Sequence, residues 1–168
     1  MPVRDIVTLP NSVLRRKARP VTKFDRNLQT LIDEMLETMR AAPGVGLAAP
    51  QLNVSQRVIV VEYPRDDTQE DSPKKVYVLI NPEIVKASQE VDIGVEGCLS
   101  VPGLVGEVER AQEVVVKGMN RHGQPMRIKS KGWLARIFQH EIDHVDGVVF
   151  SDRAARIWRP QEPIEDNV

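Results

Sequence analysis

Residues 133 to 144 read Trp-Leu-Ala-Arg-Ile-Phe-Gln-His-Glu-Ile-Asp-His, and this stretch decides how the rest of the chain is interpreted. Its pattern predicts a helix that begins near Gly132 and reaches at least His144. Residues four apart lie one above the other on a helix, so His140 and His144 can both reach one metal ion. Glu141 is offset by one position, close enough to touch a water on that ion. An H-E-x-x-H pattern on a helix is typical of metallohydrolases.

Two histidines on the surface of an amphipathic helix are the alternative interpretation. The H-E-x-x-H pattern arises by chance in well under ~1% of chains this long. Trp133, Ile137 and Phe138 also make the helix apolar enough to be buried, and a buried Glu between two histidines needs a partner. We therefore expect a divalent metal, with Glu141 handling the protons of its bound water.

A catalytic site of this kind normally has three protein ligands, so a third must come from elsewhere. The extended metzincin pattern would place it at residue 150, where this chain has Phe150. Glu162 and Glu165 lie at a thermolysin-like distance, but their proline-containing tail is a poor platform, and His122 belongs to a predicted turn. Cys98 is the remaining candidate, because two imidazoles and one thiolate are a reasonable ligand set for Zn or Fe(II).

The composition is that of one soluble globular domain. The 168 residues are 41% hydrophobic and 28% charged, with 23 Lys and Arg against 24 Asp and Glu, so we expect no direct nucleic-acid recognition. No run is long enough to span a membrane, no signal peptide is visible, and the single cysteine excludes an internal disulfide. We predict a cytoplasmic protein with a single catalytic domain over 1–168, of which 159–168 is a flexible tail.

Another helix and a series of strands precede the histidine helix. From Asp25 to Ala41, apolar residues recur every three or four positions, which predicts a helix that packs on a core and ends at Pro43-Gly44. A Gly-rich loop then runs to Gln51. We predict strands at 57–62, 75–80, 83–87, 91–95, 112–118 and 126–130, with a hairpin turn at 120–123.

This order of elements has no βαβ alternation and indicates an α+β fold. We expect antiparallel β-sheets packed around a central helix that carries His140 to His144, with the N-terminal helix on the outside.

Three motifs resemble those of the peptide deformylase family, in that family's order. They are Gly44-Val-Gly-Leu-Ala-Ala-Pro-Gln51, Glu96-Gly-Cys-Leu-Ser100 and Gln139-His-Glu-Ile-Asp-His144, and the similarity extends from about Val13 to Phe150. Three motifs in order are specific, whereas the first alone reads as a plain Gly-Pro turn. The resemblance implies hydrolysis of the N-formyl group from the N-terminal formyl-methionine of nascent bacterial-type polypeptides, releasing formate.

The resemblance also implies the metal chemistry. Cys98, His140 and His144 would ligate one metal ion, with water or hydroxide in the fourth position. Glu141 would take the proton of that water and later give it to the leaving amine. The family commonly uses Fe(2+) and accepts Zn(2+) or Ni(2+). The ligand set does not choose among them, and intrinsic affinity favours Zn(2+) over Fe(2+).

Contacts with the substrate follow from the other two motifs. In the resemblance, the side-chain amide of Gln51 and the backbone N–H of Leu99 stabilise the oxyanion. The backbone of Gly46 would hydrogen-bond the substrate main chain as a strand would, and Gly97 allows a close approach of the backbone. Val45 would be one wall of an apolar pocket for the methionine side chain.

Two further assignments have structural explanations that are equally good. Trp133, Ile137 and the helix around His140 would complete the methionine pocket, but core packing explains these residues and Val45 equally well. Glu96 and Arg110 would form an ion pair that supports Cys98 and the helix that carries His140 and His144. An ordinary surface ion pair is the alternative.

The expected partners are N-formylmethionyl nascent peptides, bound by a monomer. Some bacterial relatives have a longer, basic C-terminal helix associated with the ribosome, whereas the tail after Phe150 is short and acidic. Docking by that route is not expected, and a transient contact with the ribosome stays open.

Three rival classes stay open from the residues alone. A zinc metallopeptidase would take its third ligand downstream, so Cys98→Ala would leave metal binding intact. A cysteine hydrolase would use Cys98 as nucleophile with His140 or His144 as base, and thiol alkylation rather than chelation would inhibit it. A metal-stabilised module without activity would close the fourth ligand position with a protein group.

Overall fold

A computed structural model describes residues 3–161 of the chain. In chain order its elements are η1 (Ser12–Arg15), α1 (Arg26–Ala41), β1 (Gly46–Ala48), η2 (Ala49–Leu52), β2 (Val58–Pro64), β3 (Lys74–Ala87), β4 (Val91–Cys98), β5 (Val101–Ala111), β6 (Glu113–Met119), β7 (Pro125–Lys131), α2 (Gly132–Val145), α3 (Phe150–Arg153) and β8 (Arg156–Trp158).

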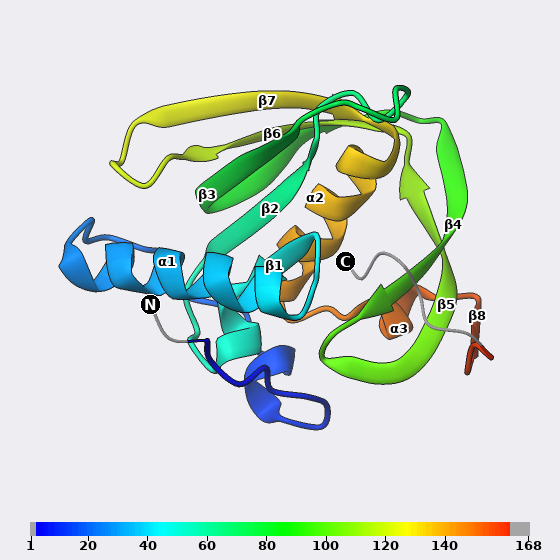
Figure 1. Cartoon of the computed structure of the whole chain (residues 1–168), viewed down its shortest axis with the longest axis horizontal. Coiled ribbons are helices and arrows are strands. Elements are labelled where there is room, and N and C mark those ends of the chain that lie inside the picture. The colour runs from blue at the N-terminus through cyan, green and yellow to red at the C-terminus, as the bar shows by residue number, and fades with distance from the viewer. Residues whose placement is uncertain (1–2, 162–168) are drawn as a thin grey trace.

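The described strands form two antiparallel sheets. One has five strands in the order β1-β2-β3-β6-β7, and the other has three in the order β4-β5-β8. Figure 1 shows α2 between the two sheets and α1 on the outer side of the large sheet. The predicted α+β fold, with a central helix that carries the two histidines, is therefore confirmed.

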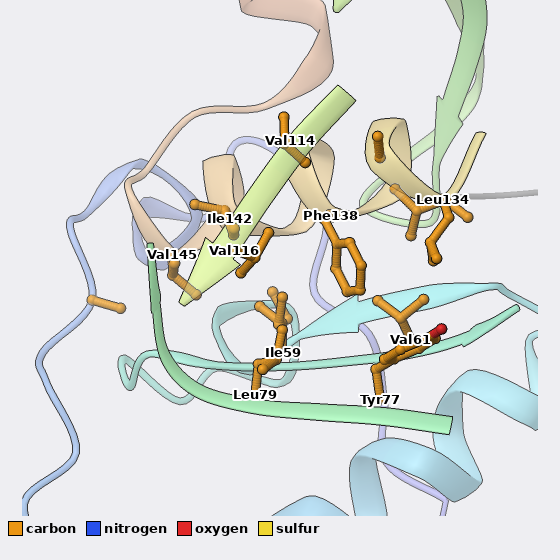
Figure 2. Close-up of a cluster of buried hydrophobic side chains, with 14 residues drawn as sticks. Ile59, Val61, Tyr77, Leu79, Val114, Val116, Leu134, Phe138, Ile142 and Val145 are labelled. Atoms are coloured by element: carbon orange, nitrogen blue, oxygen red, sulfur yellow. The ribbon is translucent and has the colours of Figure 1, made fainter. Parts of the chain in front are cut away.

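The main core lies between α2 and the inner face of the large sheet (Figure 2). Phe138 of α2 is fully buried and packs edge-to-face on Tyr77 of β3, with ring centroids 5.3 Å apart. A second cluster lies on the other face of the sheet, under α1. Strand β2 serves both, because Ile59 and Val61 join the first cluster while Val58 and Val60 join the second. This double burial explains why β2 begins with an uninterrupted apolar run.

Helix α1 has nearly the predicted bounds. Asp25 caps its N-terminus, where the side chain accepts a hydrogen bond of 3.1 Å from the backbone N–H of Leu28. At the other end, the N–H of Gly44 donates to the carbonyl of Met39. The apolar stripe that predicted the helix is the face that packs on the sheet, with Met35 and Met39 fully buried.

Several strand predictions need correction. The segments predicted separately at 75–80 and 83–87 are one strand, β3, whose register shifts between Ile80 and Glu83. The Gly-rich loop before Gln51 contains β1 and the short helix η2. Strand β5 is not predicted at all, because Pro102, two glycines and three charged residues interrupt its apolar pattern.

The end of the chain is only partly described. Of the tail predicted at 159–168, residues 162–168 lie outside the described part, and β8 ends directly before it at Trp158. Between residues 3 and 161, no helix is long and apolar enough to cross a membrane.

Candidate metal centre

Three potential ligands meet in the interior, from two different elements. His140 and His144 belong to α2, and Cys98 is the last residue of β4. One ligand atom from each residue lies within 4.8 Å of the other two, and all three residues are buried. The register of β4 against β5 shifts between Gly97 and Cys98, and such an irregularity changes the direction of a side chain. The histidines converge because they are one helical turn apart, whereas Cys98 reaches them only through the fold.

The residues present fit a divalent metal. Cys98 Sγ and His144 Nε2 are 3.3 Å apart. Two ligands that share one zinc ion, with bonds of about 2.3 and 2.0–2.1 Å, lie roughly 3.6 Å from each other. His140 Nε2 is buried and has no hydrogen-bond partner among the described residues. A buried ring nitrogen without a partner is costly, and an ion at this position would satisfy it.

Glu96 orients the His140 ring through the nitrogen that faces away from the ligand cluster. Its Oε1 lies 2.8 Å from His140 Nδ1, so the ring presents Nε2 to the centre of the cluster. Burial alone would raise the pKa of Glu96, but hydrogen bonds from Arg110 and His140 hold it well below its usual range. Burial would lower the pKa of His140, yet its contacts with Cys98 and Glu96 outweigh this and raise it to about 10. A metal at Nε2 therefore has to displace a proton.

The predicted pair of Glu96 and Arg110 is a buried, bidentate ion pair. Arg110 Nε and Nη2 each donate to Glu96 over 2.9 Å, and both side chains are at most 4% exposed. The alternative of an ordinary surface pair is thereby excluded. Arg110 also donates to Asp143 of α2 over 2.6 Å, so the guanidinium joins the small sheet to the metal helix.

Glu141, next to His140 on α2, is fully buried and has an unpaired carboxylate. Both of its oxygens are buried without a hydrogen-bond partner in the part of the chain that the structure describes. Burial raises the pKa of Glu141 to about 7. Gly46 of β1 passes directly over this carboxylate, since a Cβ at position 46 would lie 2.5 Å from Glu141 Oε2. A carboxyl group that titrates near neutrality is suited to taking up and releasing a proton.

Gln51 of η2 also points into the site. Its Oε1 accepts from the backbone N–H of Ala48 over 3.0 Å, which orients the amide so that Nε2 points toward Cys98 and Ser100. Nε2 is 3.7 Å from Cys98 Sγ and 3.1 Å from Ser100 Oγ. An N–H donor is thereby directed at the ligand cluster. Leu99 follows Cys98 directly, and its side chain packs on the cluster under α1.

The residues predicted to bind the substrate differ in their burial and in their neighbours. Gly97 pairs with Val105 next to Cys98, and the carbonyl of Val45 accepts from Glu62. Val45 and Trp133 are partly buried at the edge of the main core. Ile137 is fully buried within that core, which favours the packing explanation for this residue.

The other candidates for the third ligand lie elsewhere. Phe150 stacks on the His140 ring with centroids 6.2 Å apart, so the metzincin ligand position is an apolar wall here. His122 is exposed in the turn between β6 and β7. Glu162 and Glu165 fall outside the described residues.

Sequence reasoning missed the other charged residues around Glu96. Arg136, one helical turn before His140, donates to Glu96 Oε2 over 2.6 Å. Asp143 accepts from Arg110 and from Arg153. A signal was available, because Arg136 lies at i−4 from His140 in an apolar helix, and a charge there needs a buried partner.

Comparisons with known proteins agree with this geometry. A family model described as "Polypeptide deformylase" matches residues 3–159. A peptide deformylase of Symbiobacterium thermophilum is 51% identical over 166 residues, which cover 99% of this chain and 73% of that one. One of Halothermothrix orenii is 52% identical over 157 residues, covering 94% and 97% of the two chains. The crystal structure of peptide deformylase from Thermotoga maritima superimposes with a TM-score of 0.83 at 40% identity, covering 93% of this chain and 100% of that one.

Proposed function

The chain belongs to the polypeptide deformylase family, enzymes that remove the N-formyl group from nascent polypeptides, and from this premise we propose how its residues perform the hydrolysis. In this proposal Cys98, His140 and His144 hold one divalent metal ion, and Glu141 transfers the protons. The observation that carries the proposal is the buried Cys-His-His cluster beside an unpaired carboxylate.

The donor set supports one transition-metal ion per chain. One thiolate and two imidazoles suit Fe(2+), Zn(2+) and Ni(2+), and we propose Fe(2+) as the native metal, with the other two as substitutes. A bound divalent cation would act as a Lewis acid and lower the pKa of a coordinated water toward about 7.

Glu141 serves first as general base and then as general acid. Its oxygens accept no other hydrogen bond within residues 3–161, so they are available to the attacking water. After attack on the formyl carbon, the same carboxyl group gives the proton to the leaving amine. The buried environment favours both steps, because it brings the pKa of this group to about 7.

Gln51 and Leu99 supply the donors for the oxyanion. The orientation of Gln51 by Ala48 supports this role, because a pre-aimed amide needs no reorganisation during the reaction. The backbone at Gly46 and Gly97 binds the main chain of the formylated peptide in an extended form. Val45 and Trp133 border the side-chain pocket for the methionine.

The proposal extends to the setting in which the enzyme works. We propose that it works as a monomer, and the candidate ligand set, which is complete within one chain, is compatible with this. A single domain over 1–168 that acts in the cytoplasm and meets its substrate as the peptide leaves the ribosome agrees with a thiolate site that needs reducing conditions.

Glu141→Ala tests the division of roles. We expect this variant to retain its metal and to lose nearly all hydrolysis of a formyl-methionyl peptide, whereas Cys98→Ala should lose the metal. Metal analysis and a formate-release assay on one anaerobic sample measure both quantities. Wild-type turnover in Glu141→Ala would contradict the proposed proton transfer.

The same samples separate the rival mechanisms. A cysteine hydrolase would keep its activity in a chelator, and a metallopeptidase with a downstream ligand would keep its metal in Cys98→Ala. We expect chelation to abolish turnover and added Fe(2+) or Zn(2+) to restore it.

A further inference from the structure

Arg136 is a buried cation that the hydrolysis described above does not use. It lies in the first half of α2, and its side chain is only 5% exposed. Its Nη1 donates to Glu96 over 2.6 Å and to the carbonyl of Val108 over 2.9 Å, and its Nη2 donates to the carbonyl of Asp92 over 2.8 Å. One guanidinium on the metal helix thus contacts both β4 and β5 of the small sheet.

These contacts complete the hydrogen bonding of Glu96. Its Oε1 accepts from Arg110 and lies against His140 Nδ1, and its Oε2 accepts from Arg110 and Arg136. A carboxylate has about four acceptor sites, so all of them are filled. Without Arg136, Oε2 would lose its shortest contact, and Arg110 alone would hold the carboxylate against the His140 ring.

Charge neutralisation alone does not account for Arg136, because Arg110 already forms a bidentate pair with Glu96. Arg110 enters from β5 and contacts both oxygens, whereas Arg136 enters from α2 and donates to Oε2. The two cations therefore fix the carboxylate of Glu96 from both β5 and α2. The orientation of this carboxylate thus depends on how the two elements are packed against each other.

The guanidinium of Arg136 packs directly against the backbone of Gly94. A Cβ at position 94 would lie 2.7 Å from the Arg136 Cζ and 2.9 Å from its Nε, so a side chain there would displace the guanidinium. Gly94, Trp133 and Arg136 also help to line a cavity of about 260 Å³ beside this contact. The guanidinium also stacks near the Trp133 ring, 5.5 Å from its centroid.

We propose that Arg136 is a positioning residue for the metal centre, which acts through Glu96 on His140 and keeps the strand that carries Cys98 in place against the helix that carries both histidines. This inference rests on the proposed ligand set. It adds that Gly94 is required as a glycine because the guanidinium of Arg136 occupies the space above it.

The test compares Arg136→Ala with Arg57→Ala. Arg57 is a matched control: it is also largely buried and contacts the C-terminal end of α2, through the carbonyl of Val145 and the carboxylate of Asp146, but not Glu96. Zn²⁺ affinity, measured by competition with a chelator, should fall about tenfold or more in Arg136→Ala, because groups behind a ligating histidine typically contribute 10–100-fold. Arg57→Ala should keep the wild-type affinity.

Two readouts distinguish positioning from a loss of stability. Nitrogen NMR of the His140 ring in the Zn²⁺-loaded protein should show a weakened Nδ1–H hydrogen bond in Arg136→Ala and wild-type signals in Arg57→Ala. Arg136→Lys, which keeps the charge but not the three contacts, should recover part of the affinity. Wild-type affinity and His140 signals in Arg136→Ala would overturn the proposal, whatever its melting temperature.

Gly94→Ala gives an independent test that does not alter the arginine. It should lower Zn²⁺ affinity in the same direction, and it should add nothing in the Arg136→Ala background, where no guanidinium remains to be displaced. Additive effects of the two substitutions would contradict the proposal. A wild-type protein that binds no Zn²⁺ would instead refute the proposed ligand set, so the two failures can be told apart.

Discussion

Five buried side-chain atoms of the described residues have no hydrogen-bond partner: both carboxylate oxygens of Glu141, His140 Nε2, His144 Nδ1 and Trp133 Nε1. Each such atom costs about 1–3 kcal/mol of stability. By contrast, the carboxylate of Glu96, which supports the site without contacting the substrate, has hydrogen-bond partners on both oxygens. Three of the five, His140 Nε2 and the two Glu141 oxygens, lie where a metal and a water would bind, which is the pattern expected of a reaction centre.

Gly46→Ala should disturb this arrangement without removing any functional group. The new Cβ would lie 2.5 Å from Glu141 Oε2, and the flexible carboxylate would move aside while the backbone stayed in place. We expect kcat/KM to fall by roughly 10²-fold, as for a misplacement of about 1 Å, with metal content and melting temperature close to wild type. Steady-state kinetics and metal analysis check this.

The Glu141→Ala background is the control for that prediction. There the carboxylate is absent, so adding Gly46→Ala should lower the residual rate little further. A large additional loss would show that the backbone at Gly46, and not Glu141, is what the substitution damages.

Helix α1 shows how one element is stabilised at the level of local chemistry. Its apolar face packs on the sheet, while its first turn is closed by the side chain of Asp25. This cap lies on the outside of the molecule, far along the chain from the candidate ligands. Its contribution can therefore be changed independently of the site.

Asp25→Ala should lower the free energy of unfolding by about 1 kcal/mol, because the N–H of Leu28 loses its acceptor. The corresponding fall in melting temperature is roughly 2–4 °C for a protein of this size. Asp25→Asn keeps an oxygen acceptor and should retain most of the stability. Thermal unfolding of wild type, Asp25→Ala and Asp25→Asn measures the effect, and kcat/KM checks that the site is unchanged. An Asp25→Asn variant as destabilised as Asp25→Ala would rule out the capping explanation.

On the scale of the whole molecule, the candidate centre joins parts that are otherwise separate. Cys98 comes from the small sheet, the histidines come from α2, and Gln51 comes from the segment beside the large sheet. Figure 1 shows α2 enclosed between the sheets, so a bound ion would tie its buried face to β4. Metal binding should consequently stabilise the entire fold.

Zn²⁺ at 100 times its Kd should stabilise the protein by about 2.7 kcal/mol, or roughly 5–10 °C in melting temperature. The effect should grow as the pH rises from 6 to 8.5. The raised pKa of His140, about 10, means that its protonated form stabilises the metal-free fold fully below pH ~6.5. That contribution is lost as the pH rises toward 10, while proton competition for Nε2 weakens.

The measurement is the difference between melting temperatures with Zn²⁺ and with chelator at each pH. Cys98→Ala is the control, since it should show little difference at any pH. A stabilisation by Zn²⁺ that did not depend on pH would contradict the displacement of a proton from His140.

The sequence by itself determined those features that depend on residues close together along the chain. Helix α1, the histidine helix and most strands follow from periodicity, and the convergence of His140, Glu141 and His144 follows from the geometry of one helical turn. The α+β class could be predicted for the same reason. Strand β5 could not, because its pairing with β4 and β8 and its buried side chains override an unfavourable local composition.

Only the tertiary structure decided which distant groups meet. The proximity of Cys98 to the histidines depends on the β4–β5 hairpin packing against α2, and no local pattern encodes that distance. The same holds for Arg136, whose charge was visible in the sequence while its partner, Glu96, lies 40 residues away. Local periodicity sets which face of an element is apolar, but contacts across the interior exist only once the elements have packed.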